Sequence, residues 1–300
     1  MRMNYHIEDD TDLLPLTIDA VVKSIFTRDD PAARIALMDF LSVIIGRKVI
    51  EVRILNNEPA TTDVTQLQER LDINCKFNDT DYADVEMQLY PKNLGIEGYI
   101  SRVEYYACHL FAGQGIKGLG YPALAKVYQI TIADFTAFEH RKQMINHFQF
   151  RNNEGETLSD NVHIYFIELT KLRDILTKPI DEMTPVEMWA VFFKFVDDKS
   201  KRELLNKIIE AREGIQMAVE MLSTISKDEH ERARMLSRMK FWNDYESDVI
   251  CAIKKGKEEN SIEIARKMLK RGVKLEYIAE DTDLPINKIQ ELAQSIQSQQ

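Results

Sequence analysis

The chain has few cysteines, no long apolar run and no excess of positive charge, and each absence excludes a class of protein. Its three cysteines, Cys75, Cys108 and Cys251, lie far apart in 300 residues. They form neither a disulfide framework nor a zinc motif, which favours a reducing, cytoplasmic compartment. No apolar run approaches the roughly 18 residues that a membrane-spanning helix needs, so no membrane segment is expected. The polar, acidic stretch 1–12 argues against a signal peptide.

A net charge of −10 at pH 7 is unfavourable for a protein that coats nucleic-acid phosphates non-specifically. It does not exclude a metal-dependent enzyme acting on DNA, because a bound ion offsets carboxylates at its site. The glycines of 113–120 do not form a GxxxxGK[ST] phosphate loop. The histidines show neither HExxH nor close paired spacing, so catalytic zinc is not expected.

The most informative stretch is a predicted hairpin over 71–89. Residues 71–77 and 83–89 both alternate apolar and polar side chains, the period of a strand with one buried face. The polar residues 78–81 between them supply turn chemistry. The sequence therefore predicts two antiparallel strands with a polar outer face.

Folding this hairpin about Thr80 predicts which polar side chains stand opposite one another. The three predicted pairs are Asp72 with Gln88, Asn74 with Glu86, and Lys76 with Asp84. Asp72, Glu86 and Gln88 would then converge on one divalent cation through oxygen atoms, which points to a metal-dependent nuclease. A Lys76–Asp84 pair would help to hold that register. The alternative is a solvated outer face on which the same pair is an ordinary cross-strand contact.

The rest of the chain predicts a mixed α/β sheet core followed by helices. Helices are expected over 31–45 and 97–114, and strands over 48–55, 126–135 and 163–169. With the hairpin, the order is α-β-β-β-α-β, then a further strand, which implies a central sheet flanked by helices. After residue 184 only helices are expected, over 185–196, 201–223 and 227–253, with a break at Gly256 and short helices within 262–292. The expected domains are a core over 1–183, a long-helix region over 184–256 and a small helical tail over 257–300.

Six short stretches in this order resemble one known family. They are 19–26 (DAVVKSIF), 37–41 (LMDFL), 71–72 (LD), 85–88 (VEMQ), 102–106 (RVEYY) and 127–132 (VYQITI). Over about 19–256 the chain resembles the bacterial recombination-promoting nucleases, also described as PD-(D/E)XK nuclease family transposases. The resemblance implies a restriction-endonuclease-like core that cuts DNA phosphodiesters with a divalent metal, usually magnesium.

The resemblance also implies roles for individual residues. Asp72 and Glu86 would bind the metal, and Gln88 would orient water at the position where the superfamily most often has lysine. Lys23 would supply the missing positive charge, although a lysine on a short amphipathic helix is ordinarily a surface residue.

Three more residues are candidates with ordinary alternatives. Asp19 would be a further acid of the metal site or simply a helical partner of Lys23. Arg102 and Tyr106, one helical turn apart, would contact a DNA phosphate, or Tyr106 would pack in the core.

The C-terminal segment 262–289 resembles a helix-turn-helix appendage. Asp283 stands where that turn usually carries glycine, and Lys288 is the one basic residue of the candidate recognition helix. Two other functions stay open: a DNA-binding or interaction protein that keeps the fold without cleaving, and a helical assembly protein that forms homo-oligomers through its C-terminal helices.

Overall fold

The computed structural model describes residues 6–55, 73–89, 95–114 and 120–297. The chain divides into two compact units, Met1–Ser237 and Arg238–Gln300. None of the helices in the described ranges is long and apolar enough to cross a membrane. The three-part division at residues 183 and 256 stays a prediction.

A six-stranded mixed sheet forms the centre of the first unit, in the order β1-β2-β3-β4-β6-β5. The strands are β1 (Val52–Ile54), β2 (Ile73–Phe77), β3 (Asp81–Gln88), β4 (Val127–Ala133), β5 (Ile145–Phe148) and β6 (Val162–Glu168). The strands β3, β4 and β6 run parallel, whereas β1, β2 and β5 join by antiparallel pairing. The parallel centre has both faces covered, and its strands are buried along almost their whole length.

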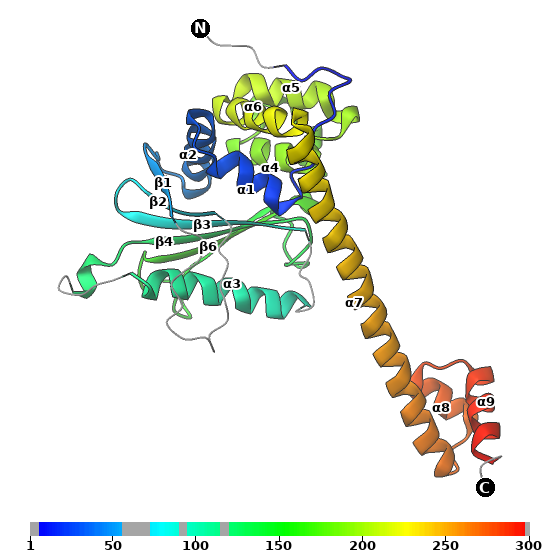
Figure 1. Cartoon of the computed structure of the whole chain (residues 1–300). Helices are drawn as coiled ribbons and strands as arrows, with labels where there is room; N and C mark the ends of the chain where they lie inside the picture. Colours follow the sequence, from blue (N-terminus) through cyan, green and yellow to red (C-terminus); the bar gives the residue numbers. More distant parts are fainter. Residues whose placement is uncertain (1–5, 56–72, 90–94, 115–119, 298–300) are drawn as a thin grey trace. The chain divides into compact units, whose positions relative to one another are not determined.

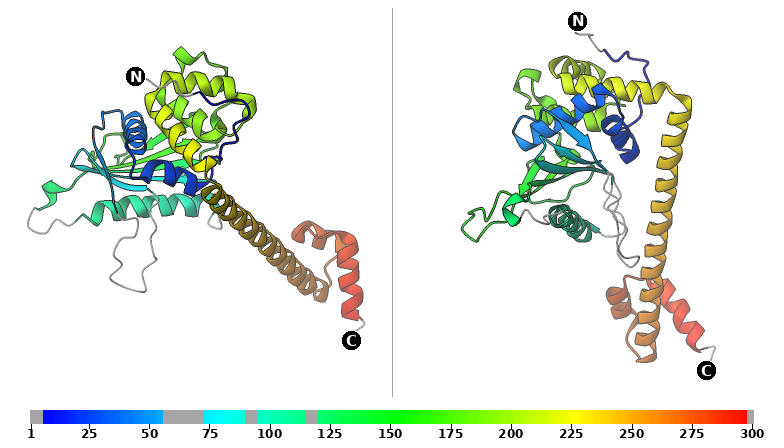
Figure 2. Two further views of the ribbon diagram at one scale, coloured as in Figure 1. Left: turned by 45° about the horizontal axis from the view of Figure 1, so that its top comes forward. Right: turned by 60° about the vertical axis from the view of Figure 1, so that its left-hand side comes forward.

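Helices cover the two faces of this sheet (Figure 1). Helix α3 (Gly95–Ala112) packs on β4 and β6 from one side. The other side carries α1 (Asp19–Thr27), α2 (Pro31–Ile45), α4 (Pro185–Phe195), α5 (Arg202–Ala211) and α6 (Glu213–Lys227), and Figure 2 shows the sheet lying between these helices and α3. The order α2-β1-β2-β3-α3-β4 confirms the predicted α-β-β-β-α-β core.

Local sequence rules explain α2, whose predicted bounds are confirmed. Asp30 caps the helix by accepting a hydrogen bond from the Ala32 amide, and Pro31 occupies the first helical position. Gly46 ends the helix with a φ of 76°, a left-handed conformation that favours glycine. Its buried face contributes Phe40 to an aromatic cluster on the side of the sheet opposite α3. The cluster consists of Phe26, Phe40, Trp189 and Phe193, whose ring centroids lie between 5.4 and 6.3 Å apart.

The hairpin is confirmed, but its predicted register is wrong by two residues. Asn74 stands opposite Asp84, and Lys76 stands opposite Tyr82. The loop closes around Asp79 rather than Thr80, because Asn78 and Asp79 adopt left-handed φ angles of 49° and 55°, which Asn and Asp tolerate.

The predicted Lys76–Asp84 ion pair is therefore absent from the described hairpin. The ammonium of Lys76 instead lies 5.9 Å from the centroid of the Tyr82 ring. Lys76 consequently gives no support to the arrangement of the polar face.

Two predictions about the helices are also wrong. The single helix expected over 201–223 is two helices, α5 and α6, because Arg212 adopts an extended conformation between them (φ −141°, ψ 112°). Its side chain makes a bidentate ion pair with Asp39 of α2, with both N–O distances 2.7 Å. Conversely, α7 (Glu229–Lys270) continues through Gly256 without a break. An exposed glycine destabilises a helix by only about 1 kcal/mol. The stability of the helical turns on either side of Gly256 outweighs this cost.

The short strand β5 was not predicted. Its four residues, Ile145–Phe148, are too few for a periodic pattern to stand out. It pairs antiparallel with β6 at the edge of the sheet.

The second unit is built on the end of α7 with α8 (Leu275–Thr282) and α9 (Ile286–Gln297). Ala265, Ile278, Leu284 and Ile289 form its small apolar core. The turn between α8 and α9 contains Asp283 at a φ of 56°, the left-handed position that glycine fills at lower cost.

Candidate functional site

Alternate residues of β3 place a row of polar side chains on the face of the sheet that α3 covers. Asp84, Glu86 and Gln88 are only 1%, 7% and 5% exposed. In the parallel register Asp84 pairs with Gln129 of β4 and Glu86 pairs with Thr131, and both partners are fully buried. At Asp84, Glu86 and Gln88 the outer face of the hairpin is therefore buried rather than solvated.

Arg102 of α3 provides a positive charge to this row. One terminal nitrogen, Nη2, donates to Glu86 Oε1 and also to Gln88 Oε1 at 3.1 Å. The guanidinium carbon lies 4.7 Å from the ring centroid of Tyr99 and 5.8 Å from that of Tyr106. A single side chain thus joins both strand residues to the helix above them.

The electrostatics of this contact favour the charged arginine. Burial disfavours the guanidinium cation, but Glu86 and the two tyrosines outweigh burial and raise the pKa of Arg102 above its ordinary value. Burial, reinforced by Glu86, raises the pKa of Tyr99 well above its ordinary value. Tyr99 therefore stays protonated, and its hydroxyl remains a neutral polar group beside the carboxylate.

A second polar contact lies one step further along the same face. The Gln129 amide donates to Asp84 Oδ2 at 2.8 Å, and both side chains are buried. The side-chain oxygens of Gln129 and Asn74 are buried without a hydrogen-bond partner among the described residues. Burial and the Asp84 charge raise the pKa of Cys75, on the opposite face of β2, to about 12, so this thiol stays protonated.

The chemistry of this face fits a hard divalent cation. Carboxylate and amide oxygens are the ligands that magnesium accepts, usually together with water molecules, and the row supplies both kinds. No group of three or more histidine, cysteine, aspartate or glutamate side chains that could hold a metal occurs within the described ranges. Asp72, the other predicted ligand, lies outside those ranges.

The structure brings Glu86, Gln88 and Arg102 together but not every other candidate. Lys23 lies on α1, on the other side of the sheet, and in the described part of the chain its ammonium makes no hydrogen bond or ion pair. The Asp19 carboxylate accepts a hydrogen bond from the neighbouring Ala20 amide at 2.6 Å. Tyr106 is partly buried beside Arg102.

Sequence reasoning missed Gln129, Thr131 and Tyr99, and it treated Asp84 only as a partner of Lys76. Gln129 and Thr131 are the two polar residues at alternate positions of β4, a strand that is buried throughout. Polar residues with that spacing inside a buried strand were the available signal, because a buried polar side chain needs a partner or a function.

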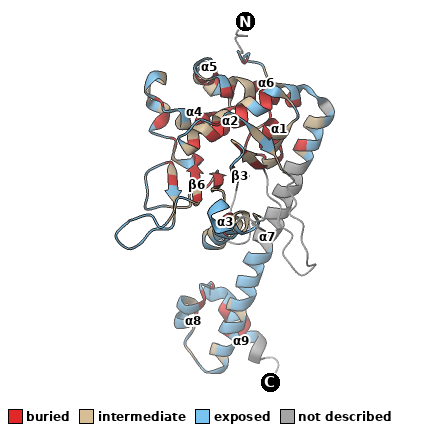
Figure 3. Ribbon diagram, turned by 90° about the vertical axis from the view of Figure 1, so that its left-hand side faces the viewer, coloured by how far each residue is buried: buried red, intermediate tan, exposed pale blue. Residues whose placement is uncertain are grey.

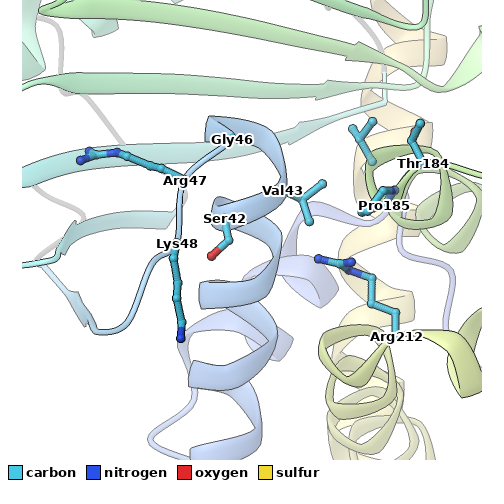
Figure 4. A pocket seen from close by; sticks show the side chains of 9 residues that line it. Ser42, Val43, Gly46, Arg47, Lys48, Thr184, Pro185 and Arg212 are labelled. Atoms are coloured by element: carbon cyan, nitrogen blue, oxygen red, sulfur yellow. The ribbon is translucent and has the colours of Figure 1, made fainter.

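A separate pocket of about 530 Å³ lies on the other side of the sheet, between α2 and the start of α4 (Figure 4). Arg47, Lys48 and Arg212 contribute positive charge to its lining. Arg47 is paired with Asp81 and Arg212 with Asp39, so much of this charge already has a partner. No residue of the row under α3 lines this pocket.

The mixed sheet, the α-β-β-β-α-β order and the acidic strand face under α3 define a restriction-endonuclease-like protein. The chain belongs to the PD-(D/E)XK nuclease family transposases, whose family model matches residues 16–252. No curated protein and no solved structure matches the chain.

Proposed function

We propose that the chain is a magnesium-dependent DNA endonuclease of low sequence specificity that acts in recombination or on mobile elements. The observation that carries this proposal is the burial of Glu86 and Gln88 on one strand face with Arg102 against both. A fold alone does not define a function. A buried carboxylate with a specific charged partner, as Glu86 has in Arg102, is a candidate for a functional site.

In this proposal Asp72 and Glu86 hold the metal. When bound, magnesium lowers the pKa of a coordinated water and stabilises charge on the attacked phosphate. Gln88 orients the attacking water by hydrogen bonding, since its amide has both a donor and an acceptor. Lys23 supplies positive charge in the DNA complex under this proposal.

Arg102 and Tyr106 are the proposed contacts to the DNA backbone. Arginine binds phosphate through two parallel hydrogen bonds, and phosphate contacts carry no sequence information. Contacts of this kind explain why we propose low sequence specificity. The net charge of −10 further argues that the protein depends on the bound ion at the site rather than on a basic surface.

Three expectations about the whole protein belong to the same proposal. The spacing of the cysteines favours the cytoplasm. The tail over 257–300 is proposed as a helix-turn-helix-like module, and the C-terminal helices are proposed to mediate homo-oligomer formation.

Nicking of supercoiled plasmid in Mg²⁺ tests the proposal. We expect the wild type to nick DNA, EDTA to abolish nicking, and Asp72→Asn to be inactive. Asp79→Asn, in the exposed turn of the same hairpin, is the matched control and should keep full activity.

The possible outcomes separate the candidate functions. Nicking that survives Asp72→Asn would place the activity elsewhere. A folded wild type that binds DNA but nicks no DNA form with any of several metals would favour the non-cleaving DNA-binding protein.

A further inference from the structure

Arg102 is bonded to two oxygen atoms of the proposed metal site. Its Nη2 atom bonds to Glu86 Oε1 and Gln88 Oε1, the carboxylate and amide oxygens of the proposed site. A divalent cation and a guanidinium cannot both be bonded closely to the same oxygens, because like charges at that separation repel strongly.

The burial of Glu86 gives a physical reason for the position of Arg102. The Glu86 side chain is only 9% exposed, and a buried carboxylate without a counter-charge is costly. Arg102 supplies that charge from α3 while stacking on Tyr99 and Tyr106.

Arg102 also has a route away from this position. Its side chain is 23% exposed, so it is not enclosed. Tyr99 and Tyr106 lie three residues before it and four after it, which places all three on one face of the helix. Cation–π contacts at partly exposed sites are weak, so the two rings do not hold the guanidinium firmly in place. Figure 3 shows parts of the α3 ribbon coloured as exposed.

We propose that Arg102 is an exchangeable counter-ion, which holds Glu86 and Gln88 in the metal-free protein and transfers to a DNA phosphate when a divalent cation binds. This inference rests on the proposed metal-dependent function. Arg102 then acts as a positioning residue before metal binding and as a phosphate ligand afterwards.

The exchange couples metal binding to DNA binding. Without DNA the cation must displace the guanidinium, which lowers metal affinity. A phosphate offers the guanidinium a bidentate alternative, so DNA raises metal affinity, and by linkage the metal raises DNA affinity by the same factor. The protein would therefore bind metal tightly only with its substrate.

Calorimetric titration with Ca²⁺ tests the exchange without depending on cleavage. We expect Arg102→Gln to bind Ca²⁺ at least about tenfold more tightly than the wild type, because the charge-assisted hydrogen bond from Arg102 to Glu86 no longer has to be broken. A short DNA duplex should raise Ca²⁺ affinity in the wild type much more than in Arg102→Gln. Arg141→Gln is the matched control, since it removes an exposed guanidinium that stacks on Phe148 instead.

Each result decides the proposal. Equal Ca²⁺ affinity in the wild type and Arg102→Gln would overturn the exchange and leave the metal site standing, whereas no binding in either would overturn the exchange together with the metal site. An equal gain in Arg141→Gln would reduce the effect to general electrostatics and also overturn it. If Arg102→Gln unfolds in EDTA, refolding by Ca²⁺ supports the exchange and failure to refold contradicts it.

Discussion

At the scale of single residues, the buried carboxylates of this protein differ in what holds them. Glu168 is completely buried, and its oxygens accept hydrogen bonds from the Ala137 and Phe138 amides, from Asn146 and from Lys171. Backbone amides fix that carboxylate, so its role is structural. Glu86 accepts a hydrogen bond from the partly exposed side chain of Arg102. A side-chain partner can move, which makes Glu86 the candidate for binding an ion.

A histidine pair on β5 and β6 is a second polar contact, and it bears on how folding stability depends on pH. His147 Nε2 and His163 Nδ1 lie 3.0 Å apart, so one ring donates to the other and both cannot be protonated without losing this bond. Burial lowers the pKa of both histidines, and Arg151 adds to this effect at His147. Asp160 opposes the shift at both rings without reversing it.

We predict that folding stability falls as the pH drops below about 6.5, the ordinary pKa of histidine. The unfolded chain then binds protons that the folded pair resists, so protonation favours unfolding. Above that pH the contribution is fully present. Urea unfolding at pH 5.5 and pH 7.5 measures the effect.

The variant His147→Gln should show a smaller difference between the two pH values than the wild type does. His140→Gln, at an exposed position, is the control and should behave as the wild type. A wild-type stability that rises on acidification would contradict the prediction.

At the scale of elements, tertiary contacts decide where helices end. The α5–α6 junction is held by Asp39, which accepts hydrogen bonds from Arg212 and from the Trp189 indole. Gly214 packs so close to Asp39 that an added Cβ would lie 2.3 Å from its side chain. A Cβ atom added at Gly256 in α7 would have no neighbouring atom within 4 Å.

Two glycine substitutions should therefore change stability in opposite directions. Gly214→Ala should destabilise the first unit by about 2 kcal/mol, because it overpacks a site whose ion pair cannot move freely. Gly256→Ala should stabilise α7 locally by up to about 1 kcal/mol through helix propensity. Urea unfolding measures the first change, and amide hydrogen exchange around residue 256 measures the second. Equal effects at the two sites would refute this account of the junction.

How far the sequence predicts these elements depends on the range of the interactions that define them. Helix α2 is predictable to the residue because its cap, its proline and Gly46 act locally. The hairpin is predictable from alternation, but its register depends on the left-handed φ angles at Asn78 and Asp79, which neither strand specifies. The break at Arg212 depends on Asp39, 173 residues earlier in the chain.

In the candidate site, too, only the features that local sequence defines are predictable. Alternation alone places Glu86 and Gln88 on one face of β3. Their contact with Arg102 depends on how α3 packs on the sheet. The contact of Asp84 with Gln129 depends on a parallel strand, β4, that is separated from β3 by 38 residues. Those contacts are consequences of the tertiary fold.

At the scale of the whole molecule, the described sheet and the row under α3 lie within Met1–Ser237. The family match ends at residue 252, within α7, so α8 and α9 lie beyond it. The described residues proposed for the chemistry, Glu86, Gln88 and Arg102, all lie within the matched range.

The central claim is that the buried polar face under α3 is the site of metal-dependent DNA cleavage. The most direct test is the initial rate of Mg²⁺-dependent plasmid nicking by Glu86→Gln, with Glu97→Gln on the exposed first turn of α3 as its matched control. The account predicts at least about a hundredfold loss for Glu86→Gln, typical of removing one group that stabilises the transition state, and an unchanged rate for Glu97→Gln. Equal rates for the two folded variants would contradict it.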